Sequence, residues 1–417
     1  MTQTSFLTPE AYARVTWEAS RQSAEARLHE FLPFTGKAYA RRRNFDLGPD
    51  DRSNVSALSP WVRHRLLLEE EVLQATLEQH DINAAEKFIQ EVLWRGYFKG
   101  WLEHRPEVWS RYKRNLTVLI DKMETDAGLA QRYADATSGK TGIACFDAWA
   151  NELVDTGYLH NHARMWFASI WIFTLQLPWE LGADFFFRHL LDGDPASNTC
   201  SWRWVGGLHT QGKTYLARAD NIEQFTEGRF NPAGQLANDA RSLQEPGLPG
   251  PQPPDTQTPE FDGQRVGLLI TEEDTSPESL SSSLQPTSIL AITEPAARSV
   301  LPTGPFAQAF TKGSVEDAVI RAEQRYGMKA KMSGTVDLAE TLRDWVQSDD
   351  LDGVVTARLP IGPARKLVTT ASADLPVPLV EITRTYDHLV WPHAAKGFFG
   401  LKKRIPMILG SLDGVRL

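Results

Sequence analysis

A chain of 417 residues that is 41% hydrophobic and 23% charged has the composition of a soluble globular protein and the length of two domains. Its formal net charge of −9 argues against a protein that holds nucleic acid by overall positive charge, although one basic patch could still do so. Two cysteines, Cys145 and Cys200, are too few for a disulfide framework or an all-cysteine iron–sulfur site. We expect a cytoplasmic protein with no signal peptide and no membrane span.

Residues 1–232 have the pattern of consecutive helices. Apolar residues recur at three- and four-residue spacings over Glu86–Leu102, Cys145–Thr156 and Asn161–Leu177. Prolines and short polar groups separate these segments. Eleven of the thirteen tryptophans precede residue 210. The sequence therefore predicts an all-helical first domain that is unusually rich in tryptophan.

The rest of the chain has a different pattern. Residues 233–263 are rich in Pro, Gly, Gln and Asp and are predicted to be a linker. Beyond them, four short apolar runs typical of buried strands alternate with amphipathic helices, which predicts a parallel sheet and a Rossmann-like domain over residues 264–417. The fold class expected is thus α plus α/β. The predicted strands are Val266–Thr271, Ser288–Thr293, Gly353–Thr356 and Val377–Ile382, and the predicted helices are Val315–Tyr326 and Val336–Val346.

Three groups in the helical half combine polar side chains with bulky apolar ones. Two of them occupy positions i, i+3 and i+4, which share one helix face: Glu91, Trp94 and Arg95, and then Asn161, Arg164 and Met165. The third is an Asp-Gly-Asp-Pro turn at residues 192–195. Taken alone, each triplet is explained as a buried apolar residue beside charged residues that face solvent. The turn, taken alone, is explained by carboxylates that cap a helix.

Metal binding is not expected at these groups. The Asp-Gly-Asp-Pro turn lacks the oxygen ligands at alternating positions that a calcium loop needs. His160 and His162 are two residues apart and would diverge on a helix. No metal site is therefore predicted.

Six short motifs, collinear from Tyr39 to Trp204, carry more information together than alone. Tyr39–Phe45 is similar to a Tyr…Arg-Asp-Phe element, and Ser56–Pro60 to a Thr-Ser-x-Leu-Ser-Pro phosphate loop. Residues 90–95 are similar to Asn-Glu-Leu-x-Trp-Arg, and residues 141–148 to Thr-Gly-x-Pro-x-x-Asp-Ala. Residues 156–165 are similar to Thr-Gly-Trp-Met-His-Asn-Arg-x-Arg-Met, and residues 191–204 to a closing Asp-Gly-Asp…Asn…Trp-x-Trp series. In this order, the motifs resemble the flavin-binding helical domain of the photolyase/cryptochrome family.

The resemblance implies an FAD site. A dinucleotide needs hydroxyls and backbone N–H groups around its pyrophosphate, and arginines that neutralise phosphate or flavin charge. Carboxylates can accept hydrogen bonds from ribose and from the flavin N–H edge, and an amide near flavin N5 tunes redox chemistry. The residues expected to bind FAD are Tyr39, Ser56, Ala57, Leu58, Ser59, Arg95, Asn161, Arg164, Asp192, Asp194 and Asn198, with Asn198 near N5.

The resemblance also implies an activity: blue-light-driven repair of cyclobutane pyrimidine dimers in DNA, by electron transfer from reduced, excited flavin. The damaged bases would leave the duplex and stack on aromatic side chains. Asn161 and Met165 stand where (6-4) photolyases place histidines, which favours the dimer type. The residues with implied catalytic roles are Glu91, Trp94, Asn161, Met165, Trp204, and the electron-relay tryptophans Trp202 and Trp179; those with implied DNA contacts are Arg43, Glu91, Trp94, His162 and Trp204.

Some positions depart from the family pattern. Val55 replaces the Thr that opens the phosphate loop, and residues 61–65, Trp-Val-Arg-His-Arg, replace a Gly-containing continuation. His162 stands where many dimer photolyases have an Arg. The third relay tryptophan is missing near residues 124–133, where Tyr133 or Trp109 would substitute. These departures weaken the inference of DNA repair more than the inference of FAD binding. They keep open the alternative of a cryptochrome-type photosensor that would act through a protein partner.

The α/β half resembles a diverged antenna domain of the same family, placed after the helical domain instead of before it. Residues 351–356 are similar to the strand after its long helix, and residues 386–404 to its exit segment. We interpret this order as a circular permutation in a monomer, with an unrelated Rossmann-like domain as the alternative. An antenna chromophore stays open, because this half has no Gly-rich phosphate motif. The basic cluster Lys396–Arg404 is expected to be a solvated end or a contact with the helical domain, with DNA contact as the alternative.

Overall fold

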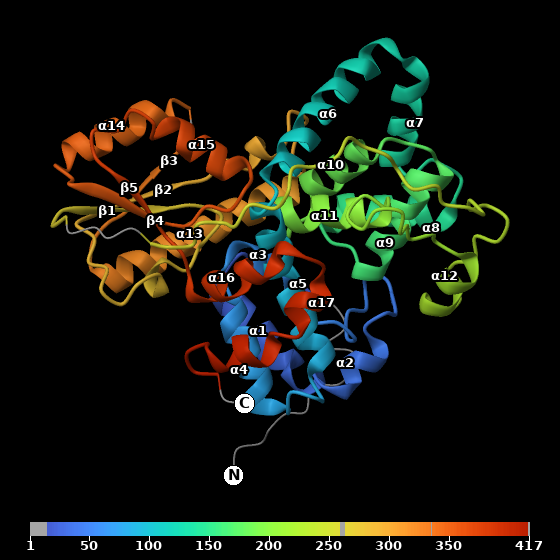
Figure 1. Cartoon of the computed structure of the whole chain (residues 1–417), viewed down its shortest axis with the longest axis horizontal. Helices are drawn as coiled ribbons and strands as arrows, with labels where there is room; N and C mark the ends of the chain where they lie inside the picture. Colours follow the sequence, from blue (N-terminus) through green and yellow to red (C-terminus); the bar gives the residue numbers. More distant parts are fainter. Residues whose placement is uncertain (1–14, 259–262, 335, 416–417) are drawn as a thin grey trace.

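The computed structural model describes residues 15–258, 263–334 and 336–415. Up to residue 258 the described chain forms helices and no strand, as the sequence predicted. These helices make the lower and right-hand part of the molecule in Figure 1. Their bounds are α1 Arg21–Phe31, α2 Lys37–Arg42, α3 Ser59–His64, α4 Glu69–Gln79, α5 Glu86–Glu103, α6 Pro106–Thr125, α7 Ala127–Thr137, α8 Ala144–Thr156, α9 Asn161–Ser169, α10 Trp179–His189, α11 Pro195–Val205 and α12 Ala219–Phe225.

The long helix predicted over Asn161–Leu177 is interrupted. Helix α9 ends at Ser169, and a single π-helical turn, η3 (Ile170–Thr174), follows it. The backbone N–H of Leu175 donates to the carbonyl of Ile170, which is the wider i→i+5 bond of a π turn. The spacing of apolar residues does not distinguish a π turn from an α-helical turn, because the buried residues Ile170, Trp171 and Ile172 are compatible with either.

A five-stranded parallel sheet follows residue 263, as expected. Its strands are β1 Val266–Ile270, β2 Ser288–Ile292, β3 Lys331–Ser333, β4 Gly353–Ala357 and β5 Leu379–Ile382, in the order β3-β2-β1-β4-β5. Helix α13 (Pro305–Tyr326) covers one face, and α14 (Leu338–Ser348) and α15 (Pro363–Ala371) cover the other (Figure 1). Strand β3 was not predicted, because Lys331 and Met332 are exposed at the sheet edge and form no apolar run.

After β5 the chain returns to the helical half. Helices α16 (Thr385–Val390), α17 (Phe398–Lys402) and α18 (Ile405–Gly410), with the 3₁₀ turn η6 (Trp391–Ala395), pack along α5. Two glycines one turn apart on α5 permit this approach: a Cβ on Gly96 would lie 2.7 Å from the Tyr386 hydroxyl, and one on Gly100 2.7 Å from Cα of Trp391. The helical half and the C-terminal helices therefore share one core. No helix in the described ranges has the length and apolarity to cross a bilayer.

Candidate functional site

The loop Ser56–Ser59 leads into α3 and is held from behind by residues that no motif identified. Ala57 adopts a left-handed backbone conformation, with φ of 52°. Arg27 on α1 donates to the carbonyls of Val55 and Ser56, both at 2.9 Å, and the indole N–H of Trp17 donates to the carbonyl of Ala57 at 3.0 Å. The loop therefore keeps its shape through bonds within the protein.

Two buried carboxylates lie at the start of α11, each paired with an arginine from another motif. Arg164 on α9 binds Asp192 through both Nη atoms, at 3.0 and 2.9 Å. Arg95 on α5 reaches Asp194 at 3.2 Å, and Asp194 also caps α11 by accepting from the backbone N–H of Ser197 at 2.7 Å. The structure thus brings together three of the helical motifs, at residues 90–95, 156–165 and 191–204, around one turn of chain.

The charge state of this turn follows from its neighbours. Burial raises the pKa of both carboxyls, but Arg164 and a hydrogen bond from Ser59 outweigh it at Asp192. At Asp194, Arg95 and Lys99 outweigh it in the same way. The pKa of each carboxyl therefore lies below its ordinary value. Both are anionic at neutral pH, beside cations that are themselves able to bind a phosphate.

Of the other residues expected at the cofactor, Asn198 is fixed by donating from Nδ2 to the carbonyl of Ala183 at 2.7 Å. Tyr39 lies beside Arg43, and burial raises the pKa of its phenol. Met165 is partly exposed and Asn161 is exposed at the start of α9. Leu58 is buried in the core beneath the loop.

Glu91 and Trp94 lie on the partly accessible face of α5. Glu91 forms an ion pair with Arg43 of the segment after α2, and burial raises the pKa of its carboxyl despite that pairing. The Trp94 indole stacks on Phe398 of α17, with ring centroids 3.8 Å apart and planes 11° apart. Phe398 therefore fixes the orientation of Trp94 and covers one of its two faces.

Trp204, the second ring expected to stack on a damaged base, has its own neighbours. It stacks on Tyr215 at 5.6 Å, and the Tyr215 hydroxyl shares a hydrogen bond of 3.3 Å with His162. His162 in turn stacks on Trp166 at 4.0 Å. Within the described residues no ring contact joins Trp94 to Trp204, so the two indoles belong to separate aromatic groups.

The expected relay tryptophans are also separate in the described part of the molecule. Trp202 contacts Trp171 at 6.1 Å, and Trp171 contacts Tyr133 at 6.1 Å. Trp179 instead contacts Tyr112 at 5.6 Å. No ring contact between Trp202 and Trp179 is present there. Sequence reasoning missed Trp171, because it lies in the π-helical turn, which has no recognisable sequence pattern.

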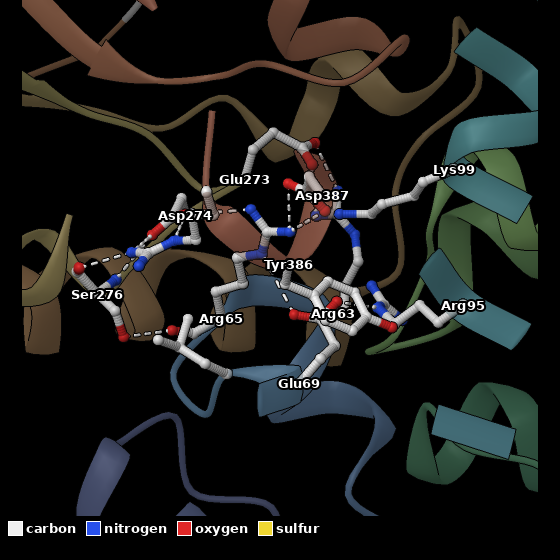
Figure 2. A network of polar contacts seen from close by, with 12 residues as sticks. Arg63, Arg65, Glu69, Arg95, Lys99, Glu273, Asp274, Ser276, Tyr386 and Asp387 are labelled. Carbon is white, nitrogen blue, oxygen red and sulfur yellow. Dashed lines mark hydrogen bonds and ion pairs between the residues drawn. The ribbon is translucent and has the colours of Figure 1, made fainter. Parts of the chain in front are cut away.

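The unusual segment Trp61–Arg65 has a structural explanation, shown in Figure 2. Arg63 binds Glu273 of the loop after β1 through two bonds of 2.7 Å, and Arg65 binds Asp387 of α16 through two more of 2.7 Å. Arg65 also takes a left-handed conformation, with φ of 56°, at the end of α3, in the segment where the family pattern contains glycine. The arginines thus join α3 to both ends of the α/β half.

This polar network reaches the candidate cofactor site. Glu69 lies between Arg65 and Arg95, with ion-pair distances of 3.5 and 3.8 Å. Arg95 is the residue that pairs with Asp194. A continuous series of charges therefore runs from the sheet to the turn Asp192–Asp194.

The donor set suits a dinucleotide. Hydroxyls of the loop, two guanidinium groups and two anionic carboxylates supply the groups that phosphates, ribose hydroxyls and a flavin N–H edge require. Several of these side chains are partly accessible and not sealed in the core: Tyr39, Ser56, Ser59, Arg95 and Arg164. No cluster of three or more metal-ligating side chains occurs among the described residues.

Comparison with known proteins agrees with this geometry. Residues 88–238 match the model of the FAD binding domain of DNA photolyase, a segment that contains most of α5 and all of α6 to α12 and excludes the phosphate loop. A deoxyribodipyrimidine photo-lyase of Streptomyces griseus is 29% identical over 228 residues, which cover 50% of this chain and 48% of the relative. A deoxyribodipyrimidine photo-lyase of Thermus thermophilus is 32% identical over 220 residues, covering 52% of this chain and 49% of the relative.

Among solved structures, the class III photolyase from Agrobacterium tumefaciens is 28% identical and covers 50% of this chain and 43% of its own, with a TM-score of 0.41. The chain spans about half the length of the curated relatives it matches. The family match contains the motifs that build the turn Asp192–Asp194 and its two arginines. The helical half of this chain is therefore similar to the FAD-binding domain of the photolyase/cryptochrome family.

Proposed function

We propose that this protein is an FAD-dependent, light-driven lyase that repairs cyclobutane pyrimidine dimers in DNA. The observation that carries the proposal is the convergence of Arg164–Asp192 and Arg95–Asp194 beside the phosphate loop, because three motifs far apart in sequence meet there. The photolyase names of the relatives support repair over light sensing. When bound, FAD would supply the light absorption and the one-electron chemistry.

The chain's own residues would bind and orient the cofactor. Arg95 and Arg164 would neutralise phosphate or flavin charge. Ser56 and Ser59 would donate to the pyrophosphate, Ser59 in exchange for its hydrogen bond to Asp192. Asp192 stays anionic beside Arg164 and can accept from the flavin N–H edge. Asn198, which is fixed through Ala183, would lie near N5.

For the substrate, we propose stacking on Trp94. Phe398 covers one indole face, so a flipped base would take the other, with Trp204 flanking the same pocket. Glu91 would exchange its contact with Arg43 for a base edge, and Met165 would line the pocket. Arg43 and His162 would then contact the strand. This substrate pocket would act in a monomer with damaged DNA as its partner.

We further propose that residues 1–232 are the cofactor domain, 233–263 the linker and 264–417 a permuted antenna-type domain. The parallel order β3-β2-β1-β4-β5 supports this reading. The crevice at the carboxyl ends of β1 and β2 holds a cavity of about 10 Å³, enough for about one water. An antenna chromophore would therefore need a place elsewhere.

The test is repair of a thymine-dimer oligonucleotide by the FAD-loaded, photoreduced protein under blue light, with a dark reaction alongside. We expect light-dependent recovery of intact thymines, lost in Trp94→Ala and kept in Phe306→Ala, an exposed aromatic on α13. FAD binding without recovery on single or double strands would refute the repair function and leave the family assignment intact.

A further inference from the structure

The C-terminal segment Lys396–Arg404 lies beside Trp94. Phe398 stacks on the Trp94 ring, and Lys402 forms an ion pair of 2.9 Å with Glu86, two turns earlier on α5. These two contacts fix α17 along α5. Figure 1 places α17 and α2 close to α5, and both helices contact it. The rim around Glu91 and Trp94 is thus built from three parts of the chain.

This segment presents an exposed aromatic side chain among cations. Phe399, the residue after the one that stacks on Trp94, is 78% exposed. Lys396, Lys403 and Arg404 are exposed, and no carboxylate lies within ion-pair distance of them in the described part of the chain. Burial of such a phenyl ring against a ligand would be favourable. In a chain with a formal net charge of −9, this is a local patch of the opposite sign.

Helix α2 adds further positive charge close to α5, the helix that carries Trp94. Arg41 is exposed without an ion pair among the described residues, whereas Arg42 is partly offset by Glu227 at 3.5 Å. Arg43 carries the ion pair to Glu91. Cations from α2 and from α17 therefore lie close to the helix that carries Trp94, so a polyanionic strand bound at Trp94 would meet positive charge from two segments of the chain.

We propose that Lys396–Arg404 is a nucleic-acid contact of the Trp94 site, with Lys403 and Arg404 binding phosphates and Phe399 stacking on a base next to the flipped one. The inference rests on the proposed function, since it needs a DNA strand at Trp94. Flipping leaves a gap in the stack that apolar side chains commonly fill. Charge complementarity favours DNA over a protein partner or a second copy of the chain.

Binding of a fluorescent single-stranded oligonucleotide carrying one thymine dimer, followed by anisotropy at several salt concentrations, tests the charges. For Lys403→Ala/Arg404→Ala we expect weaker binding and a salt slope reduced by about 1.4, since each phosphate contact on a single strand contributes about 0.7. Lys312→Ala/Arg325→Ala, which removes the same charge from α13, should bind like the wild type.

Phe399 is tested by a matched series in the same assay. Phe399→Ser should weaken binding about 5-fold or more, and Phe399→Trp should restore it, because stacking is tolerant of the aromatic used. Phe306→Ser is the control, at 50% exposure on α13. If Lys403→Ala/Arg404→Ala and Phe399→Ser both keep the affinity and the salt slope of the wild type, and repair is intact, the proposed contact is refuted and the proposed function is not. If the wild type does not bind the oligonucleotide, the contact and the proposed function are both refuted.

Discussion

The pair Arg63–Glu273 joins the helical half to the loop after β1, and its energetic role can be measured directly. Each side chain is 2% exposed, and two bonds of 2.7 Å join them. Removing one partner from such a buried pair costs about 3–5 kcal/mol, because the other charge is left without compensation. We therefore expect that much loss of unfolding free energy in Arg63→Met and again in Glu273→Met.

The double variant distinguishes this reasoning from simple loss of packing. Replacing both charges leaves no uncompensated ion. The loss of unfolding free energy in Arg63→Met/Glu273→Met should therefore be well below the sum of the losses in the two single variants, with a coupling free energy of about 3 kcal/mol or more. Urea unfolding, with the slope m compared among variants, gives these values. The exposed pair Lys312–Glu316 is the control, with coupling of about 0.5 kcal/mol or less. Single effects that add to within about 0.5 kcal/mol would refute the account.

Two further predictions concern stability. Gly100→Ala should lose about 1–3 kcal/mol of unfolding free energy in urea, because the new Cβ would lie 2.7 Å from Cα of Trp391. Gly128→Ala on α7, where the nearest atom to the new Cβ would lie at an ordinary contact distance of 3.5 Å, should lose none, and equal losses would contradict this. Burial and the neighbouring Glu69 raise the pKa of Glu70 to about 7, so the folded protein keeps a proton that the unfolded chain releases above its ordinary pKa. The contribution of Glu70 is therefore present at low pH and lost as the pH rises toward and through 7. Glu70→Gln should match the wild type at pH 5 and exceed it by about 2 kcal/mol at pH 8 in urea unfolding, whereas a difference independent of pH would contradict the shift.

The fold follows from sequence where local pattern dominates. Apolar spacing predicted α5 as Glu86–Leu102, one residue short of its end, and four apolar runs predicted four of the five strands. Apolar spacing failed to predict two elements. The π turn after α9 and the edge strand β3 have no pattern that separates them from an ordinary helix or loop.

The site shows the same division. Motif order was sufficient to group Arg95, Arg164 and the two aspartates, which the structure brings together. Arg27, which holds the phosphate loop, lies on a helix with no recognisable motif, because its role depends on carbonyls 28 and 29 residues away. The role of Phe398 likewise depends on α17 returning to α5, and no local feature of the sequence encodes that return.

The central claim is that the helical half binds FAD through the turn Asp192–Asp194 and its two arginines. Titration of FAD into apoprotein, with fluorescence and calorimetry, tests it most directly in wild type, Arg164→Met and the matched surface variant Arg325→Met. We predict one FAD per chain, bound at least about tenfold more weakly by Arg164→Met, because a charge-assisted contact is lost, and unchanged in Arg325→Met. No FAD binding by the wild type, or equal affinity in Arg164→Met, would contradict the claim.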